Sequence, residues 1–329
     1  MDVLDFPSTD LSRELSLKFG YSEFILRRWI GFFGENETVK LVEAMEDVPK
    51  YIRVNTVKVK ERALIERIKN RGFKLRKTEV PYCYEVVEEP YSLGATPEYL
   101  MGYYYIMDKS SCIPPIVLSE EFSRFEKEVI RVADFAASPG GKTTMLSQIM
   151  KDRRVSGIIL ALEAKRDRIQ PLVDNIHRMG VNNVAVFHMD ARKFPEFRYE
   201  VDAVILDAPC SGEGIIHKDK SRKVSRGAED IAFCSSLQRE LLKSAVDCTK
   251  EGGVIVYSTC SLTPEENEFV VQWAVENLPV EIDRIDFPGR GGLKKAGNFE
   301  FDSRMRFTRR YFPHTDRCSG FFVAKLRVV

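Results

Sequence analysis

Two cysteines stand where a side chain can react with a bound molecule. Residues 201–214 read VDAVILDAPCSGEG, in which an apolar run ends in Asp207 and Cys210 follows three residues later. Residues 252–261 read GGVIVYSTCS, a second apolar run followed at once by Cys260. Such runs are typical of strands buried on both faces of a parallel sheet, and ligands bind at the carboxyl ends of these strands. The sequence therefore predicts two thiols and a carboxylate at one sheet edge.

A thiolate adds readily to an electron-poor conjugated carbon and can leave again, which suits cysteine to covalent catalysis on pyrimidines. Attack on carbon 6 of cytosine makes carbon 5 nucleophilic enough to take a methyl group from a sulfonium. An acid must stabilise the ring nitrogen or exocyclic amine, and a base must remove the carbon 5 proton. We predict Asp207 for the first duty and Lys142 for orienting the base. The spacing alone does not decide which thiol attacks.

Structural cysteines are the alternative to this chemistry. Seven cysteines are an odd number, and the chain lacks CxxC pairs and the spaced histidines of a zinc site. The sequence thus predicts neither a disulfide framework nor a structural metal. We interpret the remaining thiols as small buried residues, namely Cys83, Cys112, Cys234, Cys248 and Cys318.

A glycine-rich loop follows the first predicted strand of the large sheet. Residues 134–144 read DFAASPGGKTT, where Pro139, Gly140 and Gly141 form a tight turn into a helix. Exposed amides at a helix start attract an anion, and glycine lets a ligand approach the backbone. The GGKT letters also suggest a nucleoside-triphosphate loop. That motif needs a glycine where this chain has Ala136, which opposes the triphosphate alternative.

Two further acids support a nucleoside bound through its ribose. Glu163 lies about 20 residues past the glycines, at the end of the second predicted strand in IILALEAKR. Asp190 closes the third strand in VAVFHMDA and could meet an adenine or its ribose. The pattern fits S-adenosylmethionine, with its carboxylate on the loop amides.

Strands and helices are expected to alternate in this part of the chain, which predicts an α/β fold with a doubly wound parallel sheet. The expected strands are 129–134, 156–162, 183–188, 202–207 and 253–258, with a closing strand in 320–329. The expected helices are 141–151, 164–179, 229–249 and 264–277.

A small basic α+β module is expected before this domain. Apolar residues in 1–47 fall at helical spacing, 51–59 and 81–89 read as strands, and 61–72 reads as an amphipathic helix. We predict domains 1–95 and 96–329.

The net charge is only +1, but the cations are clustered, which favours a polyanion as partner. From Lys50 to Lys77 eleven Lys or Arg face Glu61 and Glu66. The other clusters are Lys218, Lys220, Arg222, Lys223 and Arg226, and Arg304, Arg306, Arg309 and Arg310. The chain has no apolar run of about 18 residues and begins MDVLDFPSTD, unlike a signal peptide, so we expect a cytoplasmic protein without membrane contact.

The motifs ASPGGKT, LDAPCSGEG and YSTCSLTPEEN together resemble the Nop/Sun family of RNA cytosine-5 methyltransferases. The resemblance covers most of the chain, including RVNT, MDKSS, SRKVSRGAEDIAFCSSLQ, RYFPH and GFFVAKL. The chain departs from the usual family pattern at Ser138, where alanine is common, and at Ala136, where cysteine is common. Both changes are small and leave the turn feasible.

The resemblance implies a Rossmann-like methyltransferase domain, a small RNA-recognition-like module before it, and roles for individual residues. It implies that Cys260 is the nucleophile and that Cys210 assists breakdown of the covalent adduct. The implied contacts to S-adenosylmethionine are Ala136, Ala137, Ser138, Pro139, Gly140, Gly141, Lys142, Glu163, Arg168, Asp190 and Asp207.

Transfer RNA is the predicted substrate, because the chain is compact and archaeal tRNA enzymes of this family are similar. Ribosomal RNA stays open as a substrate, and we expect a monomer. A P-loop-like nucleotide hydrolase and a non-catalytic RNA-binding protein are the alternatives from other classes.

Overall fold

The computed structural model describes residues 3–125 and 128–329, which form two compact units. Unit 1 comprises Met1–Val48, Ala208–Leu242 and Ser258–Ala324. Unit 2 comprises Pro49–Asp207, Lys243–Tyr257 and Lys325–Val329. Chain order and spatial grouping therefore differ, because each unit is assembled from three separate segments.

Unit 2 begins with a four-stranded antiparallel sheet of order β2-β3-β1-β4. Its elements run β-α-β-β-α-β, the ferredoxin-like order expected of an RNA-recognition-like module. They are β1 (Lys50–Val54), α4 (Glu61–Asn70), β2 (Lys74–Lys77), β3 (Cys83–Glu88), α5 (Pro97–Leu100) and β4 (Tyr104–Ile106). Leu64 and Ile68 bury one face of α4 against apolar side chains of this sheet, so the amphipathic pattern accounts for the helix.

The large sheet of unit 2 has the strand order β14-β9-β8-β5-β6-β7. Its pairs β5–β6, β5–β8 and β6–β7 are parallel. The strands are β5 (Ile130–Phe135), β6 (Gly157–Glu163), β7 (Val184–His188), β8 (Val201–Asp207), β9 (Thr249–Thr259) and β14 (Phe321–Val328). Residues 132–135 and 203–206 are buried throughout, as a strand covered on both faces requires.

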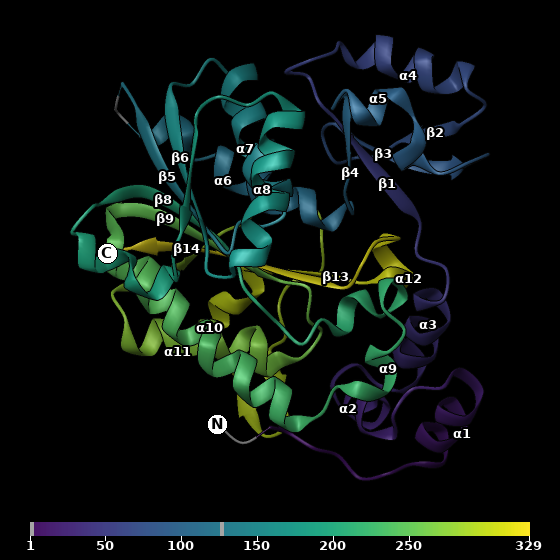
Figure 1. Ribbon diagram of the computed structural model, residues 1–329. Coiled ribbons are helices and arrows are strands. Elements are labelled where there is room, and N and C mark those ends of the chain that lie inside the picture. Colours follow the sequence, from purple (N-terminus) through teal and green to yellow (C-terminus); the bar gives the residue numbers. More distant parts are fainter. Residues whose placement is uncertain (1–2, 126–127) are drawn as a thin grey trace. The chain divides into compact units, whose positions relative to one another are not determined.

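Three helices of unit 2 lie side by side along this sheet (Figure 1). They are α6 (Ile113–Ser119), α7 (Gly141–Asp152) and α8 (Arg166–Met179). The α/β fold with a mainly parallel central sheet and a small α+β module is thus confirmed. Each predicted strand of the large sheet is present, with bounds shifted by at most a few residues.

Unit 1 packs helices from both ends of the chain around Trp29, Leu41 and Phe312. Its helices are α1 (Asp10–Phe19), α2 (Glu23–Phe33), α3 (Glu35–Met45), α9 (Arg222–Ser225), α11 (Glu268–Asn277), α12 (Pro313–Asp316) and the first part of α10 (Ala228–Cys248). Its strands are β10 (Val280–Asp283), β11 (Lys295–Ala296), β12 (Phe299–Glu300) and β13 (Arg309–Tyr311), and β13 pairs with the start of β14.

Two predicted elements are shorter than expected. The strand expected over 51–59 ends at Val54, because the Asn55 side chain accepts the Val57 amide and turns the chain. The helix expected over 264–277 begins only at Glu268, since Pro264–Glu266 form a 3₁₀ turn and Asn267 has non-helical angles. The predicted boundary at residue 95 stays a prediction, although β4 lies beyond it and pairs with β1.

Candidate active site

The two cysteine loops follow neighbouring strands and remain paired beyond the end of β8. The Ala208 amide donates to the Ser258 carbonyl at 2.8 Å. The sulfur atoms of Cys210 and Cys260 lie 3.0 Å apart, compared with about 2.05 Å in a disulfide. Both side chains are partly exposed. The structure therefore brings the two predicted thiols together, within reach of one small molecule.

Glycine is required where the second turn after β8 crosses the loop after β9. The Gly214 amide donates to the Cys260 carbonyl at 2.9 Å, and the Gly320 amide donates to the Gly214 carbonyl at 2.9 Å. A Cβ atom on Gly214 would lie only 2.1 Å from the Gly320 carbonyl oxygen. The glycine of the GEG letters thus permits the close backbone contact that fixes the Cys260 loop.

Lys142 and Asp207 form an ion pair within unit 2. Lys142 lies in the first turn of α7, and Asp207 ends β8. The Lys142 Nζ atom is 2.5 Å from the Asp207 Oδ2 atom, and the lysine side chain is only 11% exposed. The amine is therefore held in one direction by the carboxylate.

The predicted cofactor loop is held from both sides. The Ser138 hydroxyl donates to the Arg168 carbonyl at 2.8 Å, and the Arg168 guanidinium donates to the Ser138 carbonyl at 2.7 Å. Ala136 has a φ of 60° and Gly140 a φ of 95°, so the loop turns twice through the left-handed region. Within the described chain no side chain caps α7 after Gly140, and its first amides can meet an anion.

Glu163 is buried at the end of β6 with one oxygen lacking a donor. Its Oε1 atom accepts the Lys165 amide at 2.9 Å. Its Oε2 atom lies 3.8 Å from the Arg168 guanidinium and finds no hydrogen-bond donor among residues 3–125 and 128–329. A buried acceptor without a donor is costly, and the hydroxyls of a ribose would supply the missing hydrogen bonds.

Asp190 lies one strand further along the sheet. The Met189 amide donates to the Glu163 carbonyl at 2.9 Å, which places the ends of β6 and β7 side by side. The Asp190 carboxylate binds the Arg192 guanidinium at 2.6 Å, and this hydrogen bonding lowers the pKa of Asp190. Asp190 therefore stays ionised, but Arg192 already occupies part of its capacity to accept hydrogen bonds.

Two residues of this region were not predicted as site residues. Asp134 is the last residue but one of β5, is fully buried, accepts the Thr143 hydroxyl at 2.5 Å, and has a pKa raised by burial to about 7. Arg53 of β1 donates to the Gly141 carbonyl at 2.6 Å and to the Thr144 hydroxyl at 3.0 Å. Burial lowers the pKa of Arg53 to about 10. In the sequence, Asp134 could have been recognised as the acid that closes the predicted strand 129–134, and Arg53 as part of the RVNT motif.

Comparisons with known proteins identify the family of the chain. Residues 125–327 match the family described as 16S rRNA methyltransferase RsmB/F. The chain belongs to the RsmB/F family. A human relative, 28S rRNA (cytosine(4447)-C(5))-methyltransferase, is 38% identical over 96% of the chain. Ribosomal RNA small subunit methyltransferase F of Citrobacter koseri is 37% identical over 87% of the chain.

A solved structure of a methyltransferase homolog protein from Pyrococcus horikoshii resembles the chain over its whole length. Sequence identity is 37%, the TM-score is 0.85, and the match covers 98% of this chain and 100% of that one. The chain spans 39% of the human relative and 58% of the Citrobacter relative. The Nop/Sun resemblance and the Rossmann-like fold are thereby confirmed.

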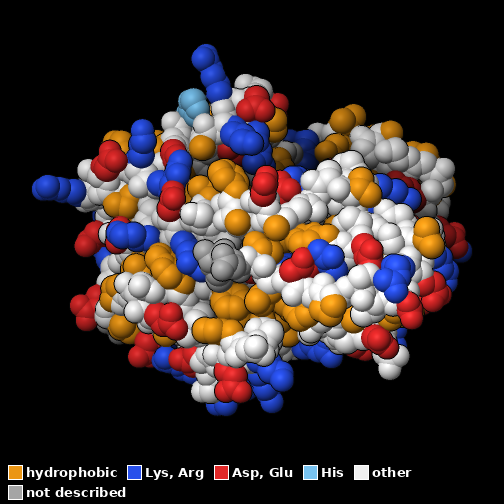
Figure 2. Space-filling view, turned by 90° about the horizontal axis from the view of Figure 1, so that it is seen from below, with side chains coloured by type: hydrophobic (Ala, Val, Ile, Leu, Met, Phe, Trp, Pro, Cys, Tyr) orange, Lys and Arg blue, Asp and Glu red, His pale blue; other side chains and the backbone are white. Residues whose placement is uncertain are grey.

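In this RsmB/F-family chain most clustered cations are already paired. Arg310 is buried against Glu268, Arg304 pairs with Asp302, and Lys223 pairs with Glu46. Figure 2 likewise shows blue and red side chains intermixed on one face of the molecule. Exposed cations without an ion pair in the described chain include Lys60, Arg67, Lys69, Lys294, Lys295 and Arg306.

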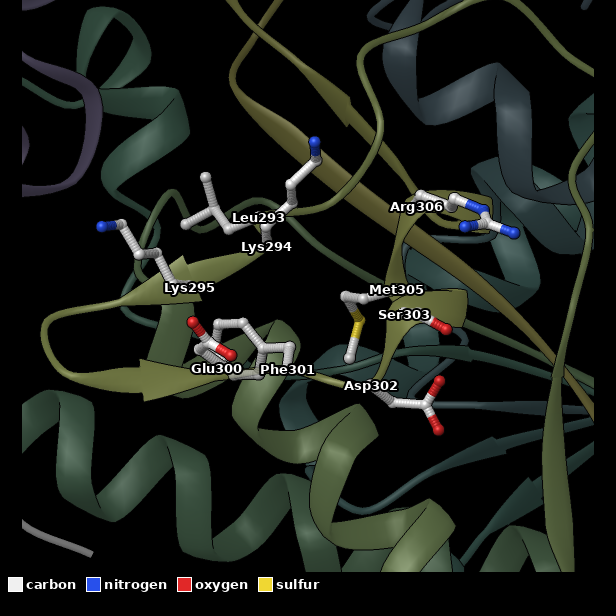
Figure 3. Close-up of a pocket in the computed structure, with 9 residues that line it drawn as sticks. All are labelled: Leu293, Lys294, Lys295, Glu300, Phe301, Asp302, Ser303, Met305 and Arg306. Carbon is white, nitrogen blue, oxygen red and sulfur yellow. The ribbon is translucent and has the colours of Figure 1, made fainter.

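Three of these cations line a pocket of about 500 Å³ in unit 1. Lys295 and Arg306 stand on opposite sides of Phe301 and Met305, and Lys294 rises beside them (Figure 3). The acids of the lining are Glu300 and Asp302, and the latter is engaged by Arg304. An apolar floor with a cationic rim suits a molecule that is both aromatic and anionic.

Two absences complete the description. Among residues 3–125 and 128–329, no group of three or more His, Cys, Asp or Glu side chains is arranged to hold a metal ion. In the same described ranges, no helix is both long enough and apolar enough to cross a bilayer.

Proposed function

We propose that this RsmB/F-family protein transfers a methyl group from S-adenosylmethionine to carbon 5 of cytosine in RNA, through a covalent adduct with a cysteine. The observation that carries the proposal is the 3.0 Å separation of the Cys210 and Cys260 sulfurs beyond two neighbouring strands. The names of the relatives support it, because the human protein is named as an rRNA cytosine-C(5)-methyltransferase.

The cofactor site is proposed to be the loop Ala136–Lys142 together with Glu163, Arg168, Asp190 and Asp207. The α7 amides would receive the carboxylate of S-adenosylmethionine. The Oε2 atom of Glu163, which lacks a donor within the described residues, would accept the ribose hydroxyls. When bound, S-adenosylmethionine supplies the methyl group from its sulfonium.

The chain's own residues would perform the remaining steps. The Cys260 thiolate bonds to carbon 6 of cytosine, and the electron pair displaced to carbon 5 receives the methyl group. Asp207 holds the ring nitrogen or exocyclic amine, and Lys142 keeps that carboxylate in place. Once the carbon 5 proton leaves to a base, the bond from carbon 6 to the Cys260 sulfur breaks, and Cys210 assists this release.

RNA is proposed to bind through the exposed cations that form no ion pair within the described chain. Lys60, Arg67 and Lys69 flank or belong to α4 of the small module, and Lys294, Lys295 and Arg306 line the pocket of Figure 3. Such cations would hold phosphates, which makes binding salt-dependent. A cytosine that is paired or stacked must also rotate out, at a cost of a few kcal/mol.

Transfer RNA is retained as the proposed substrate, with domains 1–95 and 96–329 as the RNA-binding and catalytic parts of a cytoplasmic monomer. Ribosomal RNA is the second candidate, favoured by the names of the human and Citrobacter relatives. Bisulfite sequencing of RNA from cells with and without the protein distinguishes the two, because the lost 5-methylcytosine identifies the RNA and the position.

The reaction itself is tested by incubating the full chain with bulk RNA and S-adenosylmethionine carrying a labelled methyl group. Nucleoside mass spectrometry should find the label in 5-methylcytosine. Binding of RNA without label transfer would support a non-catalytic RNA-binding protein instead. Release of phosphate from added ATP or GTP would support a nucleotide hydrolase.

A further inference from the structure

One buried carboxylate of unit 1 contacts both cysteine loops. Glu266 is fully buried in the 3₁₀ turn Pro264–Glu266. Its Oε2 atom accepts the Ser211 amide at 2.8 Å, and its Oε1 atom accepts the Ser261 hydroxyl at 2.7 Å. Ser211 follows Cys210 directly in the chain, and Ser261 follows Cys260. The carboxylate therefore joins the residue after one thiol to the residue after the other.

Further donors hold this carboxylate and the chain around Cys210. The Ser211 hydroxyl also donates to Glu266 Oε1, and the Thr263 hydroxyl donates to the same atom at 3.1 Å. Gln238 of α10 donates both to Glu266 Oε2 at 3.0 Å and to the Pro209 carbonyl at 2.9 Å. Among the described residues at least five donors thus meet this one side chain, and an ionised carboxylate suits them because it offers acceptor sites and no hydrogen of its own.

We propose that Glu266 is a positioning residue, which sets the distance between the Cys210 and Cys260 sulfurs by bridging Ser211 and Ser261. It acts through the Ser211 amide and the hydroxyls of Ser211 and Ser261, which directly follow the two cysteines in the chain. The consequence for catalysis rests on the proposed function, because formation of the adduct at Cys260 and its breakdown with Cys210 require the two sulfurs to reach the same cytosine. Reacting groups must be held to within about 0.5 Å for this purpose.

The distance between the sulfurs is measured without RNA by the rate of disulfide formation. Diamide takes up the two electrons and two protons that Cys210 and Cys260 lose when their sulfurs bond. Alkylation, digestion and mass spectrometry quantify the cross-linked peptide pair. The full chain should cross-link rapidly, and Glu266→Ala should do so about tenfold to a hundredfold more slowly.

A neighbouring buried acid provides the matched control. Glu265 is equally buried but pairs with Arg28 at 2.7 Å, and its hydrogen-bond partners among the described residues, Arg28 and Leu4, lie outside the cysteine loops. Glu265→Gln should therefore cross-link at the rate of the unmodified chain, even if its melting temperature falls. An equal slowing in Glu265→Gln would overturn the assignment to Glu266, as would a folded Glu266→Ala that cross-links at full rate.

A milder variant keeps the test decisive if Glu266→Ala does not fold. Glu266→Gln retains one acceptor oxygen for the Ser211 amide, and the hydroxyls of Ser261 and Thr263 can rotate to accept from the new amide. Its cross-linking rate should be several-fold below that of the unmodified chain and, where Glu266→Ala folds, above the rate of that variant. A Glu266→Gln rate equal to that of the unmodified chain contradicts the proposal.

Turnover gives a second readout that separates positioning from overall damage. In Glu266→Ala the kcat for RNA methylation should fall while the KM for S-adenosylmethionine stays within about twofold. Protein trapped on RNA in denaturing gels should increase, since Cys210 no longer meets the adduct. A raised KM with unchanged kcat contradicts the proposal. If the unmodified chain methylates no RNA, the proposed function fails while the cross-linking rates still decide the role of Glu266.

Discussion

The Lys142 ammonium at the start of α7 lies 2.5 Å from the Asp207 carboxylate at the end of β8. This pair joins the loop proposed to bind the methyl donor to the carboxylate proposed to hold the cytosine ring. Its geometry predicts that the two side chains act as one unit.

Asp207→Asn should lower the kcat for RNA methylation by about 10²- to 10³-fold. The amide of the variant carries no charge, so it would no longer hold the cytosine ring as the Asp207 carboxylate does. Single-turnover kinetics with saturating RNA measure this loss. Lys142→Met should cost a comparable factor, and the double variant should cost little more than either single one. Additive losses would contradict the idea of a unit.

The two cysteines should fail in different ways. Cys260→Ala should abolish methylation and leave no covalent complex, because the attacking sulfur is gone. Cys210→Ala should leave the protein trapped on its RNA, because release of the adduct is impaired. Denaturing gels of each variant with substrate RNA distinguish the two outcomes. A trapped complex from Cys260→Ala would reverse the proposed roles.

Glu163→Ala should weaken binding of S-adenosylmethionine by about 10- to 100-fold, as expected for losing charged hydrogen bonds worth roughly 1.5–3 kcal/mol. RNA affinity should stay nearly unchanged. Isothermal titration calorimetry measures the first and fluorescence anisotropy the second. Asp167→Ala, an exposed acid of α8, serves as control and should leave both affinities intact. Unchanged calorimetric affinity in Glu163→Ala would remove Glu163 from the cofactor site.

Glu213 should make stability depend on pH between about 4 and 7. Burial raises its pKa to about 7, while the Trp29 indole donates to it at 2.9 Å. The folded carboxyl holds its proton in this window and the unfolded one has lost it, so stability falls as pH rises toward 7.

Glu213→Gln should therefore gain stability relative to the unmodified chain at pH 8, on the order of a few kcal/mol, and gain little at pH 4. Urea unfolding at both pH values measures the difference. Glu229→Gln, at an exposed position in the first turn of α10, should show no such difference. An equal effect of Glu213→Gln at both pH values would exclude titration of this group.

The pocket cations should contribute to RNA affinity. Reversing charge at Lys294, Lys295 and Arg306 should weaken RNA binding by tenfold or more, and reduce the salt slope by about 0.7–0.9 for each lost phosphate contact. Anisotropy titrations from about 50 to 200 mM salt measure both quantities. Arg284→Glu is the control, since Arg284 already pairs with Asp286. An unaltered salt slope in the triple variant would place the RNA elsewhere.

The sequence predicted those site residues that follow from the pattern of a single strand or turn. Apolar runs and the residues at their ends located Asp207, Cys210 and Cys260, because parallel strands deliver their carboxyl ends to one edge. The glycine turn and Glu163 followed from the same rule. The small α+β module was also expected, although β2 and β4 are too short for their pattern to be recognised.

Long-range pairing limited what could be predicted. Charge clusters in the sequence suggested a polyanion, yet Arg310 and Arg53 are fully buried and bind polar groups inside the protein instead. Their partners, Glu268 and the Gly141 carbonyl, are distant in the chain, so counting charges along it could not reveal them. Glu266 was missed for the same reason, because its hydrogen bonds to Ser211 span 55 residues.

The anchoring of α7 by Arg53 bears on attempts to dissect or recombine this protein. A fragment that starts at residue 96 would lack the guanidinium that binds the Gly141 carbonyl and the Thr144 hydroxyl. It would also expose the hydrogen-bonding edge of β4 that pairs with β1 in the full chain. Exchanging the small α+β module between relatives should thus succeed only when the donor module carries an arginine at the position of Arg53. This one side chain links the module to α7.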